Sequence, residues 1–348
     1  MAALKALLLG GWIGMALIGA NVPVARGCSP VEGWQLQWEH ALTRQGAAGE
    51  TIGGFSAIAY EPLQQRIWLL SDLPKPELSL WGWPAPRSTP QLLQQRRITA
   101  PGNEALDGEG LLLTAHQLWM ASEGRRTAER PALLLRVNRS DGRTLQTIPL
   151  PAEWQAGPGL GLASNAGPES LTRLSGAGER LELLMAAERP LLQDTNNQVR
   201  LLRWWWPAGG TTSAAPQASP QGWLQLPEPE EGASPWSLTD LLALPRATGK
   251  ATTLLALLRR FSPPHQWDNL LALYALPQAG TVARPLQLWN LQTAGLTPEN
   301  WEGLTFGPPQ HHGGISLLLV SDDNLNPLQS SRLALLTPKP PQACLEQP

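Results

Sequence analysis

The sequence predicts an all-β protein, and within that class a β-propeller of five four-stranded blades. Short apolar runs of strand length recur along the chain, with turns between them. The 34 Pro and 33 Gly among 348 residues suit a chain with many turns and few long helices. Above the strands, a longer unit repeats five times, and a long fixed period is typical of propellers. Six blades are the alternative, because the segment 190–235 is long enough to contain extra strands.

The N-terminus has the pattern of an export signal. Lys5 precedes an apolar run over residues 6–20, which is shorter than the roughly 20 residues of a membrane span. Ala25-Arg26-Gly27 provides a small-x-small cleavage site. We therefore expect a signal peptide over residues 1–27 and one mature domain over residues 28–348. That domain would be periplasmic or extracellular, with no membrane span after cleavage. The alternative is an uncleaved N-terminal anchor.

The segment 34–40 supplies the strand that closes the predicted ring. Between residues 53 and 337, each unit has four candidate strands except the last, which has three. The segment 34–40 completes that fifth blade, so the two ends of the chain meet. Cys28 and Cys344 lie at these ends, and in an oxidising compartment we expect them to form a disulfide bond. Two unpaired thiols are the alternative.

Each unit places polar residues at two repeated positions. A polar or acidic residue opens one apolar strand, and after a turn a second apolar strand usually ends in an acid. The opening residues are Ser56, Glu109, Glu169, Asp240 and Glu302, with spacings of 53, 60, 71 and 62. The acids that end the following strands are Asp72, Glu123, Glu188 and Asp322. Because the innermost strands of a propeller surround one axis, we expect these acids to form a ring there.

A ring of carboxylates has a definite chemistry. Neighbouring carboxylates repel one another, so they need a cation, shared protons or Arg partners. Hard cations such as calcium take oxygen ligands, and we expect Asp72, Glu123 and Glu188 to be among them. The alternative is structural, namely that acids at repeat positions accept hydrogen bonds from backbone amides of the next blade.

The segment 322–326 adds two candidate calcium ligands, Asp323 and Asn324. Its sequence, Asp-Asp-Asn-Leu-Asn, places oxygen ligands at alternate positions, as the opening of a calcium loop does. It is not an EF-hand, because Pro327 stands where that loop needs Gly. A turn rich in Asn and Asp is the alternative interpretation.

Several arginines directly follow the repeated apolar strands. They are Arg125, Arg126, Arg189, Arg259 and Arg260, of which we select Arg126, Arg189 and Arg260. Guanidinium groups bind phosphate and carboxylate through paired hydrogen bonds, so we expect these residues to bind substrate. The alternative is that they neutralise the acidic ring.

Charge and motifs exclude several functional classes. The chain has 26 basic and 28 acidic residues, whereas a nucleic-acid binder has a strong basic excess. Neither the G-x-S-x-G nucleophile motif nor the G-x-x-x-x-G-K-[ST] phosphate loop occurs. We therefore expect no nucleic-acid partner, and we expect the protein to be a monomer.

Tryptophan dominates the aromatic residues, with 16 Trp against 2 Tyr and 3 Phe. Trp68, Trp119 and Trp301 fall within or beside the repeated strands, which predicts packing between blades. In the run Trp204-Trp205-Trp206, strand alternation places the first and third side chains on one face. Packing between blades is expected there too, and a stacking platform for a ligand is the alternative.

These units resemble the phytase-like domain family, also called the "esterase-like activity of phytase" family. The resemblance lies in GGFSAIAYEP (53–62), DGEGLLL (107–113), LWMASEG (118–124), SLTDLLAL (237–244), NWEGLTFGP (300–308) and LLLVSDDN (317–324). The last two motifs are the most specific, and the set covers almost the whole mature chain. The resemblance implies an exported propeller-like fold whose Asp and Glu residues serve the hydrolysis of phosphate or other esters.

The chain departs from the family pattern in two units. Where members tend to read L-E-R, this chain has Leu258-Arg259-Arg260 and so loses a carboxylate. The third unit has Glu169-Ser170 in place of Glu-Gly. The residues that match best are Glu109, Glu302, Asp322 and Asp323.

The sequence therefore predicts a phytase-like hydrolase that cleaves a phosphate mono- or diester, or another ester, with the help of calcium. The predicted catalytic carboxylates are Glu109, Glu169, Glu302 and Asp322, of which Glu302 or Glu109 would orient or deprotonate water. The competing hypothesis is a non-catalytic binding module whose acids are structural or hold a structural cation.

Overall fold

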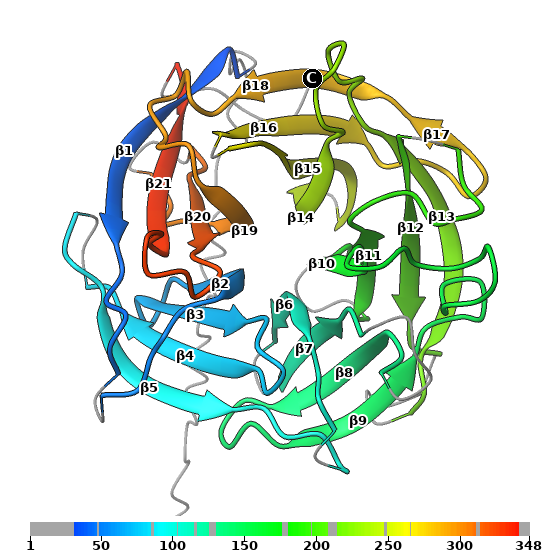
Figure 1. The fold of residues 1–348 in the computed structure, drawn as a ribbon, viewed down its shortest axis with the longest axis horizontal. Helices are drawn as coiled ribbons and strands as arrows, with labels where there is room; N and C mark the ends of the chain where they lie inside the picture. The colour runs from blue at the N-terminus through cyan, green and yellow to red at the C-terminus, as the bar shows by residue number, and fades with distance from the viewer. Residues whose placement is uncertain are drawn as a thin grey trace, which may run out of the picture.

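The computed structural model arranges the chain as five sheets around a central axis (Figure 1). It describes residues 31–46, 49–84, 87–102, 104–114, 117–124, 130–175, 180–195, 197–207, 214–246, 249–264, 266–310 and 314–340. All the regular elements in these ranges are strands. The predicted all-β propeller with five blades is therefore confirmed.

Four predicted features lie outside the described residues. They are the signal peptide (1–27), Cys28, Cys344 and Arg126. The export signal and the disulfide bond therefore stay predictions. Within the ranges that the structure describes, no helix is long and apolar enough to span a membrane.

Each blade is an antiparallel sheet whose strands follow one another from the axis outward. Blade 1 contains β2 (Phe55–Glu61), β3 (Arg66–Ser71), β4 (Glu77–Gly82) and β5 (Gln91–Arg97). Blade 2 contains β6 (Gly108–Leu113), β7 (Gln117–Ser122), β8 (Leu133–Asn138) and β9 (Thr144–Pro149). Blade 3 contains β10 (Pro168–Arg173), β11 (Glu182–Ala187), β12 (Gln198–Trp205) and β13 (Gln217–Gln225). Blade 4 contains β14 (Ser237–Arg246), β15 (Gly249–Ser262), β16 (Gln266–Ala275) and β18 (Pro285–Asn290). Blade 5 contains β19 (Asn300–Phe306), β20 (Leu317–Asp322), β21 (Arg332–Lys339) and β1 (Gly33–Ala41).

The N-terminal strand closes the ring as the sequence predicts. β1 pairs antiparallel with β21, from Gly33 opposite Lys339 to Ala41 opposite Arg332. The outer strand of blade 5 thus comes from the other end of the chain, and its hydrogen bonds hold the first and last parts of the propeller together.

The segment 190–235 forms no sixth blade. It contains β12 and β13, which are the two outer strands of blade 3. One strand was not predicted, namely β17 (Val282–Ala283), which adds to β13 in parallel. Because the insertion completes an existing blade, the six-blade alternative is excluded.

The hydrophobic core lies between the blades, in five clusters that each combine two neighbouring blades. Trp119 of β7 packs against Trp206, which follows β12, with ring centroids 4.7 Å apart. Trp204 and Trp206 are both buried, and Trp301 is fully buried. The predicted packing of Trp between blades is confirmed, and the alternative of a stacking platform at residues 204–206 is wrong.

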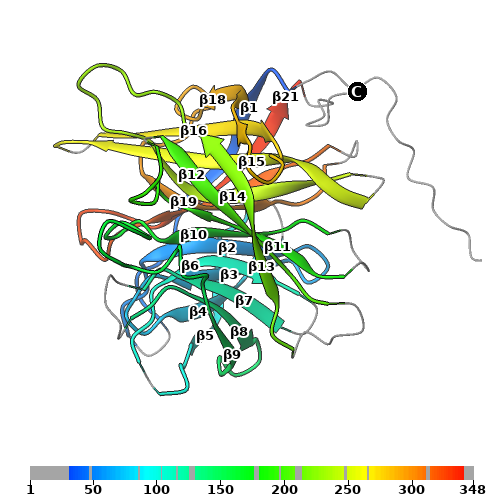
Figure 2. The ribbon, with the colours of Figure 1, turned by 90° about the vertical axis from the view of Figure 1, so that its right-hand side faces the viewer.

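The inner strands bring the starts of all five repeats to one axis. β2, β6, β10, β14 and β19 line the centre of the ring in Figure 1, and each contacts the inner strands of both neighbouring blades. Figure 2 shows the ring from the side, where β15, the longest strand with 14 residues, extends beyond its neighbours. Residues at the starts of the inner strands can therefore meet at one end of the axis.

Candidate catalytic and metal site

A β-bulge near the start of each inner strand shows which residues are structurally equivalent. In every blade the register between the first and second strands shifts at one residue. The residues at these shifts are Ser56, Glu109, Glu169, Thr239 and Glu302. A bulge redirects a side chain out of the strand alternation. Three of the five repeats therefore present a Glu at the same redirected position.

In blade 4 the equivalent residue is Thr239, which corrects the predicted choice of Asp240. Ser56 and Thr239 make the same contacts, because each hydroxyl donates to a carbonyl of its own second strand and to one of the next inner strand. The alignment of the five repeats placed blade 4 one residue too far along the chain. Thr239 and Asp240 are both polar, and the bulge interrupts the strand alternation that would distinguish them.

Asp240 has the structural role that was the alternative to a place in the ring, because it accepts hydrogen bonds from backbone amides. Its Oδ1 accepts from the backbone N of Leu241 at 2.7 Å, and its Oδ2 accepts from the backbone N of Leu304 in blade 5 at 2.6 Å. Gly110 and Gly303 hold the same position in blades 2 and 5, and a Cβ at either would lie 2.9 Å from a backbone N of the next inner strand. This position faces the neighbouring blade, so Asp240 joins two blades and does not belong to the ring.

A second equivalent set follows from the ends of the second strands. The strand pairing makes Ser71, Ser122, Ala187, Leu258 and Ser321 equivalent, because each pairs with the residue just before the bulge. The residues that follow them are Asp72, Glu123, Glu188, Arg259 and Asp322. The four predicted acids thus occupy four of the five places, and blade 4 contributes an arginine.

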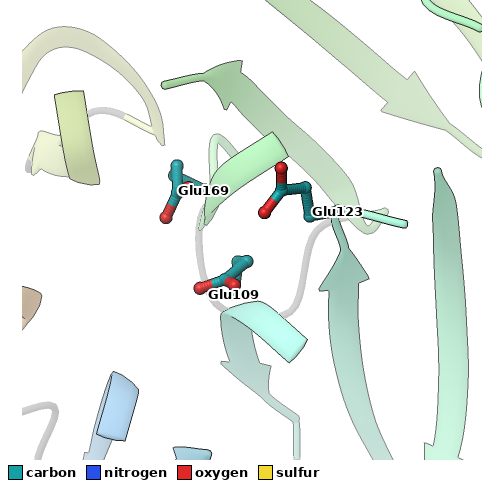
Figure 3. A group of neighbouring side chains, drawn as sticks. All are labelled: Glu109, Glu123 and Glu169. Carbon is teal, nitrogen blue, oxygen red and sulfur yellow. The ribbon is translucent and has the colours of Figure 1, made fainter. Parts of the chain in front are cut away.

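Glu109, Glu123 and Glu169 come together at the interface of blades 2 and 3. Each offers a carboxylate oxygen, and these oxygens lie within 4.8 Å of one another. Figure 3 shows the three carboxylates facing a common space. All three side chains are buried, and among the described residues no ion pair involves any of them. The group has the oxygen donors that a hard cation prefers.

Arg259 lies on the other side of the ring and connects its remaining acids. Its Nη1 donates to Glu302 Oε1 and to Asn300 Oδ1, and its Nη2 donates to Glu188 Oε1 at 3.4 Å. Asn300 Nδ2 donates in turn to Glu302 Oε1 at 2.9 Å and to Asp322 Oδ2 at 3.1 Å. Glu188, Glu302 and Asp322 are therefore linked to one guanidinium, directly or through Asn300.

Burial and mutual repulsion raise the pKa values of the acids. Burial, then the neighbouring Glu169 and Glu302, raise the pKa of Glu109 well above its usual range. Burial, Glu188 and Glu123 do the same to the pKa of Glu169. Burial and Asp107 raise the pKa of Glu123 to about 7. Carboxylates in this state are protonated at neutral pH unless a cation stabilises the charged form.

The same pattern extends to the other half of the ring. Burial, then Glu302 and Asp107, raise the pKa of Asp72 to about 7. Burial and Glu302 raise the pKa of Asp322 well above its usual range. Burial alone would lower the pKa of Arg259, but Glu302 and Glu188 outweigh it and raise that pKa, so the guanidinium stays charged. Strongly perturbed groups that share one space are typical of functional sites.

A comparison with protein families identifies the chain. The model described as "Phytase-like: Esterase-like activity of phytase" matches residues 50–325, which spans all five inner strands. The chain belongs to this phytase-like family. The predicted family is thereby confirmed, and at the level of the family it supports a phytase-like hydrolase that acts on a small-molecule ester.

Other comparisons add little to this assignment. No curated protein matches the phytase-like chain. Among solved structures, the β-propeller domain of Cps50 (Swd1) from Myceliophteria thermophila is 10% identical, with 83% of this chain and 84% of that chain covered and a TM-score of 0.38. The WD40 domain of Pan2 from Neurospora crassa is 8% identical, with 89% and 97% covered and a TM-score of 0.37. The family assignment rests on the family model.

The donor set of the phytase-like propeller fits a calcium ion. Three carboxylates converge at Glu109, Glu123 and Glu169, and Glu188 adds a buried Oε2 with no hydrogen-bond partner within the described structure. Glu188 faces this group closely enough to raise the pKa of Glu169. Buried unpaired oxygens without a cation are costly, whereas calcium takes six to eight such ligands. The residues present can therefore hold calcium or a similar hard cation.

Asp323 and Asn324, two predicted calcium ligands, make hydrogen bonds in and around the loop after β20. Asp323 Oδ1 accepts from the backbone N of Gly54 at 2.9 Å and from that of Leu325 at 3.1 Å. Arg44 Nε lies 3.4 Å from Asp323 Oδ2. Asn324 is exposed, and its Nδ2 donates to Gln329. These contacts match the polar-turn interpretation, since Asp323 fastens blade 5 to the start of blade 1.

Of the two selected arginines that the structure describes, one lies at the edge of the ring and the other points away from it. Arg189 is half exposed at the edge of the ring, where its Nη2 lies 3.8 Å from Glu188 Oε1. Arg260 points away from the ring, because successive strand residues face opposite sides. It pairs with Asp268 at 2.8 Å and with Glu230, and it stacks 4.6 Å over the ring of Trp236. The guanidinium in the ring belongs to Arg259.

Sequence reasoning left three residues out of the site. Arg259 was visible as a departure from the repeat, but Arg260 was selected in its place. Asp107 and Asn300 occupy equivalent positions, just before the strand residue that precedes the bulge. Asp107 pairs with Arg130 at 3.3 Å and raises the pKa of Glu123. Their signal was the polar residue two positions before the Glu of each E-G-h motif.

The opposite end of the axis is chemically different. A cavity of about 290 Å³ lies there, lined by the later parts of the inner strands. Its walls include Ile58, Leu111, Leu241 and Phe306, and its acid, Asp240, is already held by two backbone amides. Arg173 is also among its lining residues, whereas the carboxylates of the ring lie at the end where the inner strands begin.

Proposed function

We propose that this phytase-like protein is an exported, calcium-dependent hydrolase of phosphate mono- or diesters, acting at the acidic end of its axis. The observation that carries the proposal is the convergence of Glu109, Glu123 and Glu169, whose oxygens lie within 4.8 Å of one another. Membership of the family supplies the class of ester. The predicted signal peptide over residues 1–27 supports export.

A phosphate ester can bind at this end only if the negative charge is first reduced. Glu109, Glu123 and Glu169 would hold calcium, with Glu188 beside them. Bound calcium would neutralise part of the charge on the phosphoryl oxygens and polarise the phosphorus centre. Arg189 is half exposed at the edge of the ring, so its guanidinium can reach a phosphoryl oxygen from the solvent side.

Asp72, a predicted calcium ligand that lies outside the group of Glu109, Glu123 and Glu169, is our candidate proton acceptor for a water molecule. It is only partly buried, and its pKa of about 7 suits a general base near neutral pH. Of the two bases expected from the sequence, Glu302 already accepts from Arg259 and Asn300, and Glu109 belongs to the group that would hold calcium. We therefore assign proton abstraction to Asp72, while Glu302 orients the groups around it.

The experiment is hydrolysis of p-nitrophenyl phosphate, bis-p-nitrophenyl phosphate and phytate by the mature protein, in calcium and in EDTA. We expect calcium-dependent turnover of at least one substrate, lost in Glu109→Gln and Glu169→Gln. Loss of one general acid–base group typically lowers the rate by about 10²- to 10⁴-fold, which is the effect expected for Asp72→Asn. The exposed Glu231 provides the control Glu231→Gln, with unchanged turnover.

A non-catalytic binding module is the second candidate, and the roles of Asp240 and Asp323 favour it. Both acids lie next to a repeated position of the ring, and both fasten one blade to the next. If no phosphate ester is turned over while EDTA still lowers the melting temperature, the acidic ring holds a structural cation and the hydrolase proposal fails.

A further inference from the structure

We infer that Arg259 is a built-in cation of the ring: it takes the place of a second metal ion beside Glu188, Glu302 and Asp322, and leaves a single metal site at Glu109, Glu123 and Glu169. The inference rests on the proposed calcium site, and it concerns how many cations the ring holds and where.

The equivalence of the blades is the first argument. Strand pairing places Arg259 where the other four blades have Asp72, Glu123, Glu188 and Asp322. A ring with five acids at this level would need more than one divalent cation for neutrality. In this chain, Arg259 of blade 4 places a positive charge where a fifth acid would place a negative one. The total charge of these five residues is therefore more positive by two than that of five acids.

The contacts of Arg259 are the second argument. The guanidinium touches Glu302 and Asn300 with one nitrogen and Glu188 with another, so it lies among oxygens from blades 3 and 5. A metal ion held between these two blades would have the same oxygens as ligands. The side chain of Arg259 is only 16% exposed, so its charge is fixed at this position and is not free for solvent.

Asn300 extends the effect of Arg259 to the last acid. Its Oδ1 accepts from Arg259, which fixes the amide so that its Nδ2 donates to Glu302 and Asp322. Asp322 Oδ1 accepts in addition from the backbone N of Asn324 at 2.7 Å. Glu302 Oε1 and both oxygens of Asp322 therefore already accept hydrogen bonds.

The other half of the ring has no such internal cation. No described ion pair involves Glu109, Glu123 or Glu169, and Glu188 keeps one buried oxygen, Oε2, without a partner. Glu188 lies between the two halves of the ring. Its Oε1 accepts a hydrogen bond from Arg259, and its Oε2 has no partner among the described residues. This unpartnered oxygen lies on the side of blades 2 and 3, where the carboxylates of Glu109, Glu123 and Glu169 converge and a single ion fits.

The test counts calcium ions by isothermal titration and equilibrium dialysis with calcium chloride. In Arg259→Gln we expect one more calcium ion per chain than in the wild-type protein, together with a larger calcium-induced rise in melting temperature. Arg260→Gln is the matched control, because it removes the same charge from the next residue while its partners Asp268 and Glu230 lie outside the ring. It should bind as many ions as the wild type.

A second pair of variants keeps the inference testable if Arg259→Gln does not fold. Glu169→Gln should weaken calcium binding by more than the ~10-fold typical of losing an outer-sphere partner, whereas Glu302→Gln should leave calcium affinity within a factor of about three. Equal weakening in both variants, or an unchanged ion count in folded Arg259→Gln, would overturn the inference. A wild-type protein that binds calcium but hydrolyses nothing would defeat the proposed function and leave this inference intact.

Discussion

Replacing Glu123 by Gln should stabilise the metal-free protein at pH 8, which is unusual for a change at a candidate functional site. Glu123 is 8% exposed, and burial, Asp107 and Glu188 raise its pKa from 4.5 to about 7. At about 1.4 kcal/mol per pKa unit, the ionised form costs the folded state about 3 kcal/mol. Glu123→Gln removes this charge and keeps a carbonyl oxygen as acceptor.

The direction of the pH dependence follows from the raised pKa. Between pH 4.5 and about 7, the folded state keeps a proton on Glu123 that the unfolded state releases. The contribution of the protonated Glu123 to the free energy of unfolding is therefore fully present below pH 4.5 and is lost as the pH rises through about 7. The wild type in EDTA should therefore melt at a lower temperature at pH 8 than at pH 5. Glu123→Gln should recover about 5 °C at pH 8 and show little change at pH 5.

The assay is thermal unfolding, followed by tryptophan fluorescence, in EDTA and in calcium. In calcium at pH 8, the wild type should have the higher melting temperature, because calcium raises the melting temperature of the wild type more than that of the variant. Glu231→Gln, which makes the same change on the surface, should shift neither curve. A Glu123→Gln protein that is less stable than the wild type in EDTA at pH 8 would refute the reasoning, because the carboxylate would then be stabilising without a cation.

Three further predictions concern the scaffold. Asp240→Ala leaves the backbone N–H groups of Leu241 and Leu304 without their acceptor, so urea unfolding should show a loss of about 2–4 kcal/mol with and without calcium alike. Gly110→Ala places a Cβ 2.9 Å from backbone atoms of β10, and the melting temperature should fall by several degrees, equivalent to about 1–3 kcal/mol. Trp119→Ala opens a cavity between blades 2 and 3 and should cost about 3–5 kcal/mol in the same assay, whereas Trp119→Phe should cost less.

Much of the fold followed from the sequence, because turns and apolar strands repeat with a fixed order. The segment 34–40 was identified as the closing strand by the missing fourth strand of the last unit, and β1 pairs with β21 accordingly. In a closed ring the first and last blades are neighbours, so a segment that precedes the first unit lies close enough to complete the last blade. β17 could not be predicted, because two residues carry no periodicity.

The site was predicted less completely, for a reason that lies in the bulges. Alternation along a strand decides which side chain faces the axis, and one extra residue reverses it. Asp240 was therefore placed in the ring, although it accepts hydrogen bonds from the next blade. The same one-residue step separates Arg259 in the ring from Arg260 on the far side of the strand.

The distribution of charge around the axis explains why one side of the ring is the better site. Blades 2, 3 and 5 each place an acid at both repeated positions, namely Glu109 with Glu123, Glu169 with Glu188, and Glu302 with Asp322. In blade 5, however, Glu302 already accepts from Arg259 and Asp322 from Asn300. Blade 4 places Thr239 and Arg259 there, so it contributes a positive charge and no acid. Since a cation and a guanidinium repel each other, an ion should settle away from blade 4, between blades 2 and 3. The repeat alone predicts a symmetrical ring, whereas the departures in blade 4 make it asymmetrical.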